Sequence, residues 1–186
     1  MRDLTDLKTY IIDSEDPHEV DDAISIEIKD GSIKQLWIHI SNPCKLFLLD
    51  STIDKEARKK STSLYLTERY ESMLPKNIIE IANLKQNKIS NTISGSIIFN
   101  EDGSINKYEI VEAIIKPKYQ LTYEDANEII ELEPKEEYEL IEIKKLLLKS
   151  INYRKDKGAI IFDTLSSKIK INNKDITLVK LDKTIS

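Results

Sequence analysis

The sequence is poor in glycine, cysteine and histidine, and each shortage excludes a class of functional site. Its four glycines lie far apart along 186 residues. Dinucleotide-binding fingerprints and phosphate-binding loops need clustered glycines for close backbone approach, so we expect no nucleotide cofactor. One cysteine and two histidines are too few for a tetrahedral zinc site built from these residues alone. Cys44 also has no partner for a disulfide within the chain.

Long hydrophobic runs are missing as well. Segments such as 46–49 are far shorter than the roughly 20 apolar residues that a transmembrane helix needs. The first ten residues, MRDLTDLKTY, resemble neither a signal peptide nor an organellar transit peptide. With 40% hydrophobic and 33% charged residues, the composition predicts one soluble globular domain in the reducing setting of the cytoplasm.

The charge balance is slightly acidic. Lysine and arginine number 28 against 33 aspartates and glutamates, which gives a net charge of -5. Taken alone, this excess argues against a polyanion as partner. Three basic clusters remain as candidate phosphate contacts or as solvated faces: Lys59–Lys60, Lys116–Lys118 and Arg154–Lys157.

The first part of the chain has the pattern of strands. Isoleucines alternate with polar residues over 24–28, and Asp30-Gly31 offers a tight turn into the apolar, β-branched segment 33–41. This pattern predicts a hairpin. A short helix is expected over 52–60, with Ser51 as its N-cap.

A second hairpin is expected further along the chain. Its strands would be 93–99 and 105–115, joined by a turn at 100–103 that ends in glycine. The two hairpins therefore predict two sheet segments.

Helices and further strands are expected after residue 117. Thr122 can cap a helix with Asp125 three residues on, and a longer helix is expected from near Pro134 to Gly158. Strands are predicted for the tail at 158–164, 167–171 and 176–181. This order of elements favours an α+β domain with mixed β-sheets and packed helices.

Acidic residues crowd the segment between the first two predicted strands. Six of them fall within ten positions: Asp13, Glu15, Asp16, Glu19, Asp21 and Asp22. Asp13 ends one strand and Asp22 begins the next, so the loop between them could fold Glu19 and Asp21 back toward both. Carboxylates brought close together raise one another's pKa values, and a divalent cation such as magnesium is the usual remedy. The alternative is a solvated acidic turn.

Other kinds of site have less support. An EF-hand calcium loop starting at Asp13 would need glycine where this chain has His18. We expect His18 to be a surface residue, because magnesium prefers oxygen ligands. His39 lies between isoleucines on a predicted strand and is expected to be a packed, hydrogen-bonded histidine. No serine or cysteine occupies an evident nucleophile elbow.

Six ordered blocks extend the pattern beyond the acidic cluster: RDLT (2–5), IDSEDPHEVDDAIS (12–25), IHISNP (38–43), STIDKEARKKSTSLYL (51–66), MLP (73–75) and LTYEDA (121–126). In order and spacing they resemble the catalytic domain of the ribonuclease II family, the RNB domain. The resemblance implies a mixed α/β fold around a channel for single-stranded RNA. It also implies a magnesium-dependent exoribonuclease that degrades RNA from the 3' end and releases nucleoside 5'-monophosphates.

The resemblance assigns roles to individual residues. It implies that Asp13 and Asp22 hold magnesium directly, and that Asp21 and Glu19 support the metal and the attacking water. Most family members carry aspartate where this chain has Glu19, and HEVDD resembles the branch found in plastids and photosynthetic bacteria. Tyr65 matches a tyrosine that stacks on a base near the RNA 3' end. The alternative for Tyr65 is a core aromatic residue.

The resemblance also implies that residues 1–186 are the N-terminal portion of a longer catalytic domain. The later part of an RNB domain normally supplies arginines that contact the scissile phosphate. We therefore expect an exoribonuclease, represented here by a portion that could be inactive alone. The alternative is a non-catalytic remnant that binds RNA or a partner.

Overall fold

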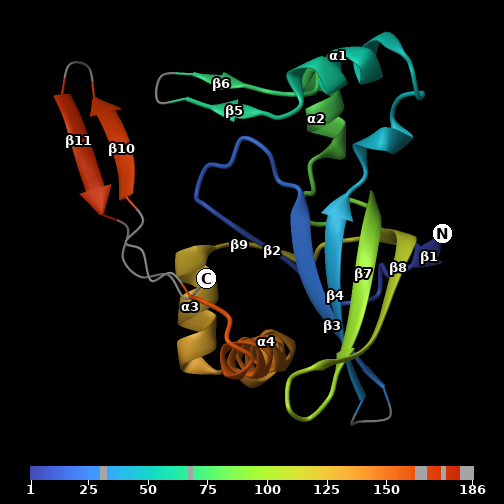
Figure 1. Ribbon diagram of the computed structural model, residues 1–186, viewed down its shortest axis with the longest axis vertical. Coiled ribbons are helices and arrows are strands. Elements are labelled where there is room, and N and C mark those ends of the chain that lie inside the picture. Colours follow the sequence, from blue (N-terminus) through green and yellow to red (C-terminus); the bar gives the residue numbers. More distant parts are fainter. Residues whose placement is uncertain (30–32, 67–68, 162–166, 173–174, 181–186) are drawn as a thin grey trace.

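The computed structural model describes residues 1–29, 33–66, 69–161, 167–172 and 175–180. It is built on a seven-stranded mixed sheet in the order β1-β8-β7-β4-β3-β2-β9 (Figure 1). These strands are β1 (Arg2–Asp3), β2 (Thr9–Asp13), β3 (Asp22–Lys29), β4 (Ile33–Ser41), β7 (Ser90–Phe99), β8 (Ile105–Ile115) and β9 (Tyr119–Thr122). The helices are α1 (Thr52–Lys60), α2 (Lys76–Ala82), α3 (Tyr123–Leu132) and α4 (Tyr138–Asp156). The fold is therefore α+β, as the sequence predicts.

Both predicted hairpins are present, but they do not form separate sheets. β3 pairs with β4, and β7 pairs with β8, each in antiparallel fashion. β4 also pairs with β7, from Gln35↔Ile98 to Ser41↔Thr92, and this pairing joins the hairpins into one sheet. The expectation of two sheet segments is therefore wrong, because β4 offers a paired edge on each side. The turn expected at Asp30-Gly31 lies outside the described residues.

The predicted helices are confirmed with small changes. Ser51 caps α1, and Thr122 and Asp125 form a reciprocal capping box at the start of α3. The longer helix starts later than expected, because a 3-10 turn over Lys135–Glu137 precedes α4. Gly158 follows α4 with a φ of 89°, a left-handed conformation that glycine adopts without strain.

The tail forms a separate hairpin of β10 (Ser167–Asn172) and β11 (Asp175–Lys180). This agrees with two of the three predicted tail strands. The strand expected over 158–164 is wrong for its described part, since residues 159–161 have no regular structure. Residues 162–164 lie outside the described residues.

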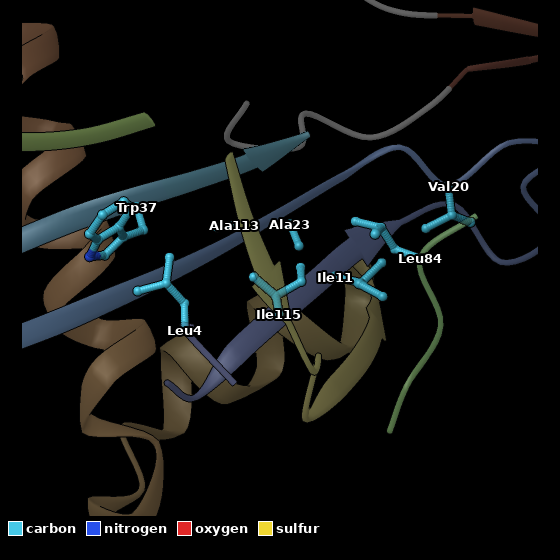
Figure 2. Close-up of a cluster of buried hydrophobic side chains, with 8 residues drawn as sticks. All are labelled: Leu4, Ile11, Val20, Ala23, Trp37, Leu84, Ala113 and Ile115. Carbon is cyan, nitrogen blue, oxygen red and sulfur yellow. The ribbon is translucent and has the colours of Figure 1, made fainter. Parts of the chain in front are cut away.

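Each face of the main sheet has its own apolar core. On one face, β2, β3, β4 and β8 pack against residues from the N-terminal segment and the loops (Figure 2); the buried members are Leu4, Ile11, Val20, Ala23, Trp37, Leu84, Ala113 and Ile115. On the other face, α4 covers Ile26 and Leu36 with Leu140 and Ile143. A third, smaller cluster lies between α1 and α2 and includes Ala57 and Ile78.

His39 is a packed core residue, as expected. It is fully buried on β4, where Nε2 lies 2.9 Å from Ser25 Oγ and Nδ1 lies 2.8 Å from Ser94 Oγ. The Trp37 ring lies nearly parallel to it, with centroids 6.3 Å apart. These hydroxyl partners satisfy both ring nitrogens, so His39 has a structural role and not the position of a catalytic base.

Part of the α4-covered face remains open. Beyond the helix, this face carries four exposed isoleucines of β4, β7 and β8: Ile38, Ile40, Ile93 and Ile110. They lie on the same face of the sheet as Leu36, because side chains alternate along each strand. No helix in the described part of the chain is long and apolar enough to cross a membrane.

Candidate functional site

The candidate site lies where β2 ends and β3 begins, and the backbone around it explains its shape. β2 and β3 are paired only at Thr9↔Ser25 and Tyr10↔Ile24, so the chain between Asp13 and Asp22 is free to open outward. Figure 1 shows this loop extending from the sheet toward the small hairpin of β5 (Leu64–Tyr65) and β6 (Tyr70–Glu71).

Val20 anchors the end of the acidic loop. Its side chain is buried in the core cluster. Its backbone N–H donates to Asn83 Oδ1 at 3.3 Å, and its carbonyl accepts from the Leu84 N–H at 2.9 Å. On the following residue, the Asp21 carbonyl accepts from the Ser41 N–H at 2.7 Å. With Val20 turned inward, the neighbouring carboxylates of Glu19 and Asp21 are left outside the core.

Glu19 is held by three hydroxyl groups from the β5–β6 hairpin and the segment before it. Ser63 Oγ donates to Glu19 Oε1 at 2.9 Å, and the Tyr70 hydroxyl donates to the same oxygen. The Tyr65 hydroxyl donates to Glu19 Oε2 over a longer distance, 3.4 Å. Ser63 Oγ is itself fixed, because it accepts from the Met73 N–H at 2.9 Å. Glu19 is therefore tethered to a segment more than forty positions away.

Asp21 and Asp22 both have raised pKa values. The pKa of Asp21 is raised by loss of hydration and then by the nearby carboxylate of Glu19, with smaller effects from Asp22 and Asp13. The pKa of Asp22 is raised by loss of hydration and then by Asp13. A weak bond from Ser41 Oγ to Asp21, at 3.4 Å, acts in the opposite direction. Glu19, Asp22 and Asp13 thus lie close enough to Asp21 to disfavour its charged form.

These carboxylates form an acidic cluster and not a closed coordination shell. Within the described ranges, no three His, Cys, Asp or Glu side chains are gathered as ligands of a metal ion. Carboxylate oxygens are the hard ligands that magnesium takes, and magnesium keeps several waters of its own. A cation would offset the part of the raised pKa of Asp21 and Asp22 that comes from neighbouring carboxylates, which is smaller than the part from loss of hydration.

An aromatic platform borders the cluster. Tyr65 is 63% exposed, so the alternative of a core aromatic is wrong. Its ring lies 5.1 Å from the ring of Tyr70, which in turn stacks on His18 at 4.5 Å. His18 is exposed, as expected, and contacts rings rather than carboxylates.

Two tyrosines near the cluster have no role assigned from the sequence. The phenol pKa of Tyr70 is raised by loss of hydration and by its bond to Glu19. The phenol pKa of Tyr123, the first residue of α3, is raised by loss of hydration and then by the charges of Asp13 and Asp22. β9 runs parallel to β2 and pairs Thr122 with Asp13, which brings Tyr123 to the site. Tyr123 lies within the quoted LTYEDA block, whereas Tyr70 has no comparable signal.

A cavity of about 230 Å³ adjoins the cluster, with Glu19, Asp21 and Ser41 in its wall. Its other side is largely apolar and includes Leu74 and Ile79. The site therefore combines a carboxylate rim, an exposed aromatic surface and a partly apolar recess. This combination suits a ligand with both anionic and aromatic parts once a cation offsets the carboxylates.

The basic clusters are only partly available for phosphate. Lys59 pairs with Glu56 at 2.7 Å, and Lys60 donates to the Ser72 carbonyl at 2.9 Å. Lys116 and Lys118 are exposed. Lys116 and Lys118 are therefore more accessible to a phosphate than Lys59 and Lys60, and the phosphate contact itself stays a prediction.

Comparison with known proteins identifies a family. The sequence model described as RNB domain matches residues 1–186. The chain is 37% identical to the chloroplastic/mitochondrial ribonuclease II of Arabidopsis thaliana over 173 residues, covering 92% of this chain and 21% of that protein. It is 36% identical to an uncharacterised ribonuclease of Synechocystis over 183 residues, covering 98% of this chain and 28% of that protein.

A solved structure shares the fold. The RNase R of Mycoplasma genitalium in complex with ribose-methylated single-stranded RNA superposes with a TM-score of 0.79 and 21% identity. The match covers 96% of this chain and 29% of that chain. The chain thus spans less than a third of the length of each of these relatives.

Proposed function

We propose that this chain, which belongs to the RNB-domain family, forms the N-terminal portion of the catalytic domain of a magnesium-dependent 3'-5' exoribonuclease. The substrate would be single-stranded RNA, and the products would be nucleoside 5'-monophosphates. The observation that carries the proposal is that Asp13, Glu19 and Asp22 lie near enough to Asp21 to raise its pKa, at the end of the sheet beside the exposed ring of Tyr65.

The residues present fit a magnesium site. Asp13 and Asp22 would hold the ion, with Asp21 and Glu19 beside it. The raised pKa values of Asp21 and Asp22 support this, because after loss of hydration their next cause is the charge of a neighbouring carboxylate, Glu19 for Asp21 and Asp13 for Asp22. When bound, magnesium supplies two things to phosphodiester hydrolysis: a lower pKa for a water molecule and an offset to the charge that builds on the phosphate.

The other residues of the site would bind and orient RNA. Tyr65 offers an exposed ring for stacking on a base, a contact worth roughly 1–3 kcal/mol that depends little on sequence. Glu19, tethered by Ser63 and Tyr70, would orient a water molecule near the phosphate. RNA as the substrate is supported by a structural neighbour, an RNase R that was solved with single-stranded RNA bound.

The test is an RNA degradation assay on the full-length protein with single-stranded RNA that is labelled along its whole length. We expect Asp21→Asn to abolish release of mononucleotides while RNA binding persists, because an amide cannot replace the charge of the carboxylate. Asp16→Asn is the matched control, since Asp16 is an exposed residue of the same loop. An Asp21→Asn protein with parental activity would refute the proposal.

The 186-residue chain should be tested beside the full-length protein. RNA binding without release of mononucleotides by both proteins would favour the non-catalytic alternative. Mononucleotides from the full-length protein alone would mean that catalysis also needs residues outside this portion.

A further inference from the structure

Glu19 has a longer and more flexible side chain than the three aspartates of the cluster. It also accepts hydrogen bonds from three neighbouring hydroxyl groups. A glutamate side chain has three rotatable bonds, so holding it in one orientation costs conformational entropy. The two carboxylate oxygens of Glu19 differ in how many hydrogen bonds hold them. Oε1 accepts from both Ser63 and Tyr70, whereas Oε2 has only the 3.4 Å contact with the exposed Tyr65. Oε1 is the anchored oxygen, and Oε2 is the one left for another partner.

Tyr70 is itself unusually well fixed for a residue on a two-stranded hairpin. It pairs with Tyr65 across β5 and β6. Its ring is stacked on His18 with an interplanar angle of 13°, and it contacts the Tyr65 ring on the same hairpin. The phenol hydroxyl therefore reaches Glu19 from a ring whose orientation is already set.

We propose that Tyr70 is a positioning residue that acts through Glu19: its hydroxyl fixes Oε1 and thereby directs Oε2 toward the reaction. This inference rests on the proposed function, because it concerns how the same site turns over RNA. The ring of Tyr70 has a separable role, which is to support Tyr65. A hydrogen bond to a charged acceptor is stronger than one to a neutral acceptor, so loss of the Tyr70 hydroxyl should loosen the hold on Glu19.

The experiment separates the hydroxyl from the ring in the full-length protein. Tyr70→Phe removes only the hydroxyl, and we expect kcat on single-stranded RNA with magnesium to fall on the order of tenfold. KM, the Kd for RNA and the melting temperature should stay at parental values. Tyr70→Leu also removes the ring and should raise KM, because Tyr65 loses its support. Tyr108→Phe is the control, since Tyr108 is 70% exposed on β8.

A double-mutant cycle tests whether Tyr70 acts through Glu19. Glu19→Gln removes the charged acceptor, so adding Tyr70→Phe to it should cause little further loss of kcat. A merely structural role would lower the melting temperature and would multiply the two losses. Parental kcat in Tyr70→Phe, or full multiplication in the double variant, would overturn the inference.

Failure of this inference can be told apart from failure of the proposed function. An active Asp21→Asn protein would refute the function, whatever Tyr70 does. An inactive Asp21→Asn protein together with a normal Tyr70→Phe protein would refute only the positioning role.

Discussion

The buried His39 makes the stability of the protein depend on pH in a predictable window. Burial without a charged partner lowers the pKa of His39 from about 6.5 to about 4. The unfolded chain therefore takes up a proton on this residue at a higher pH than the folded protein does. Stability is fully present above pH 6.5 and is lost as pH falls toward 4.

The size of the effect follows from the two pKa values. The loss is roughly 2 kcal/mol at pH 5 and approaches roughly 3 kcal/mol at pH 4. Asp21 and Asp22 act in the opposite direction, since their raised pKa values give stability that is lost as pH rises. The net curve is therefore a poor test, and the difference between the parent and a His39 variant is the useful quantity.

The assay is urea unfolding at pH 7.5 and pH 5, in a chelator, followed by tryptophan fluorescence. Trp37 is the single tryptophan and lies beside His39, so its emission reports this core. In His39→Gln the stability difference between the two pH values should shift by roughly 2 kcal/mol relative to the parent. An unaltered pH dependence in His39→Gln would refute the reasoning.

Three further outcomes are expected. Thr122→Ala should lower the free energy of unfolding by about 1 kcal/mol in urea titration, because it breaks the capping box of α3. Ile110→Thr should change stability by less than about 0.5 kcal/mol and reduce light scattering from aggregates, whereas the buried Ile26→Thr should cost roughly 2 kcal/mol or more. Magnesium at about 100 times its Kd should stabilise the protein by about 2.7 kcal/mol in thermal unfolding, and Asp22→Asn should abolish this gain.

The parts of the fold set by local patterns could be predicted from the sequence. The Thr122–Asp125 cap, the β7–β8 hairpin and the stop at Gly158 each depend on residues close together in the chain. The pairing of β4 with β7 could not be predicted, because it joins segments more than fifty positions apart. Alternation identifies which residues share a face but not which strand lies beside them.

In the candidate site, too, local features could be predicted from the sequence and contacts between distant segments could not. Asp13 and Asp22 flank one loop, so their approach could be predicted from strand ends alone. The partners of Glu19 could not, since the position of the β5–β6 hairpin depends on the cluster between α1 and α2, into which Met73 packs. Tyr70 reaches Glu19 only through that tertiary arrangement.

The ion pairs of the structure show which acidic residues have a basic partner and which do not. Many carboxylates away from the site are neutralised locally; Glu142, for example, contacts both Lys34 and Lys145. In the described part of the chain, by contrast, no lysine or arginine pairs with any carboxylate of the acidic cluster. In the proposed function, an RNA phosphate would have to approach these unpaired carboxylates. An anion can enter such a site only together with a cation, so we expect RNA binding and magnesium binding to strengthen each other, by the same factor in both directions.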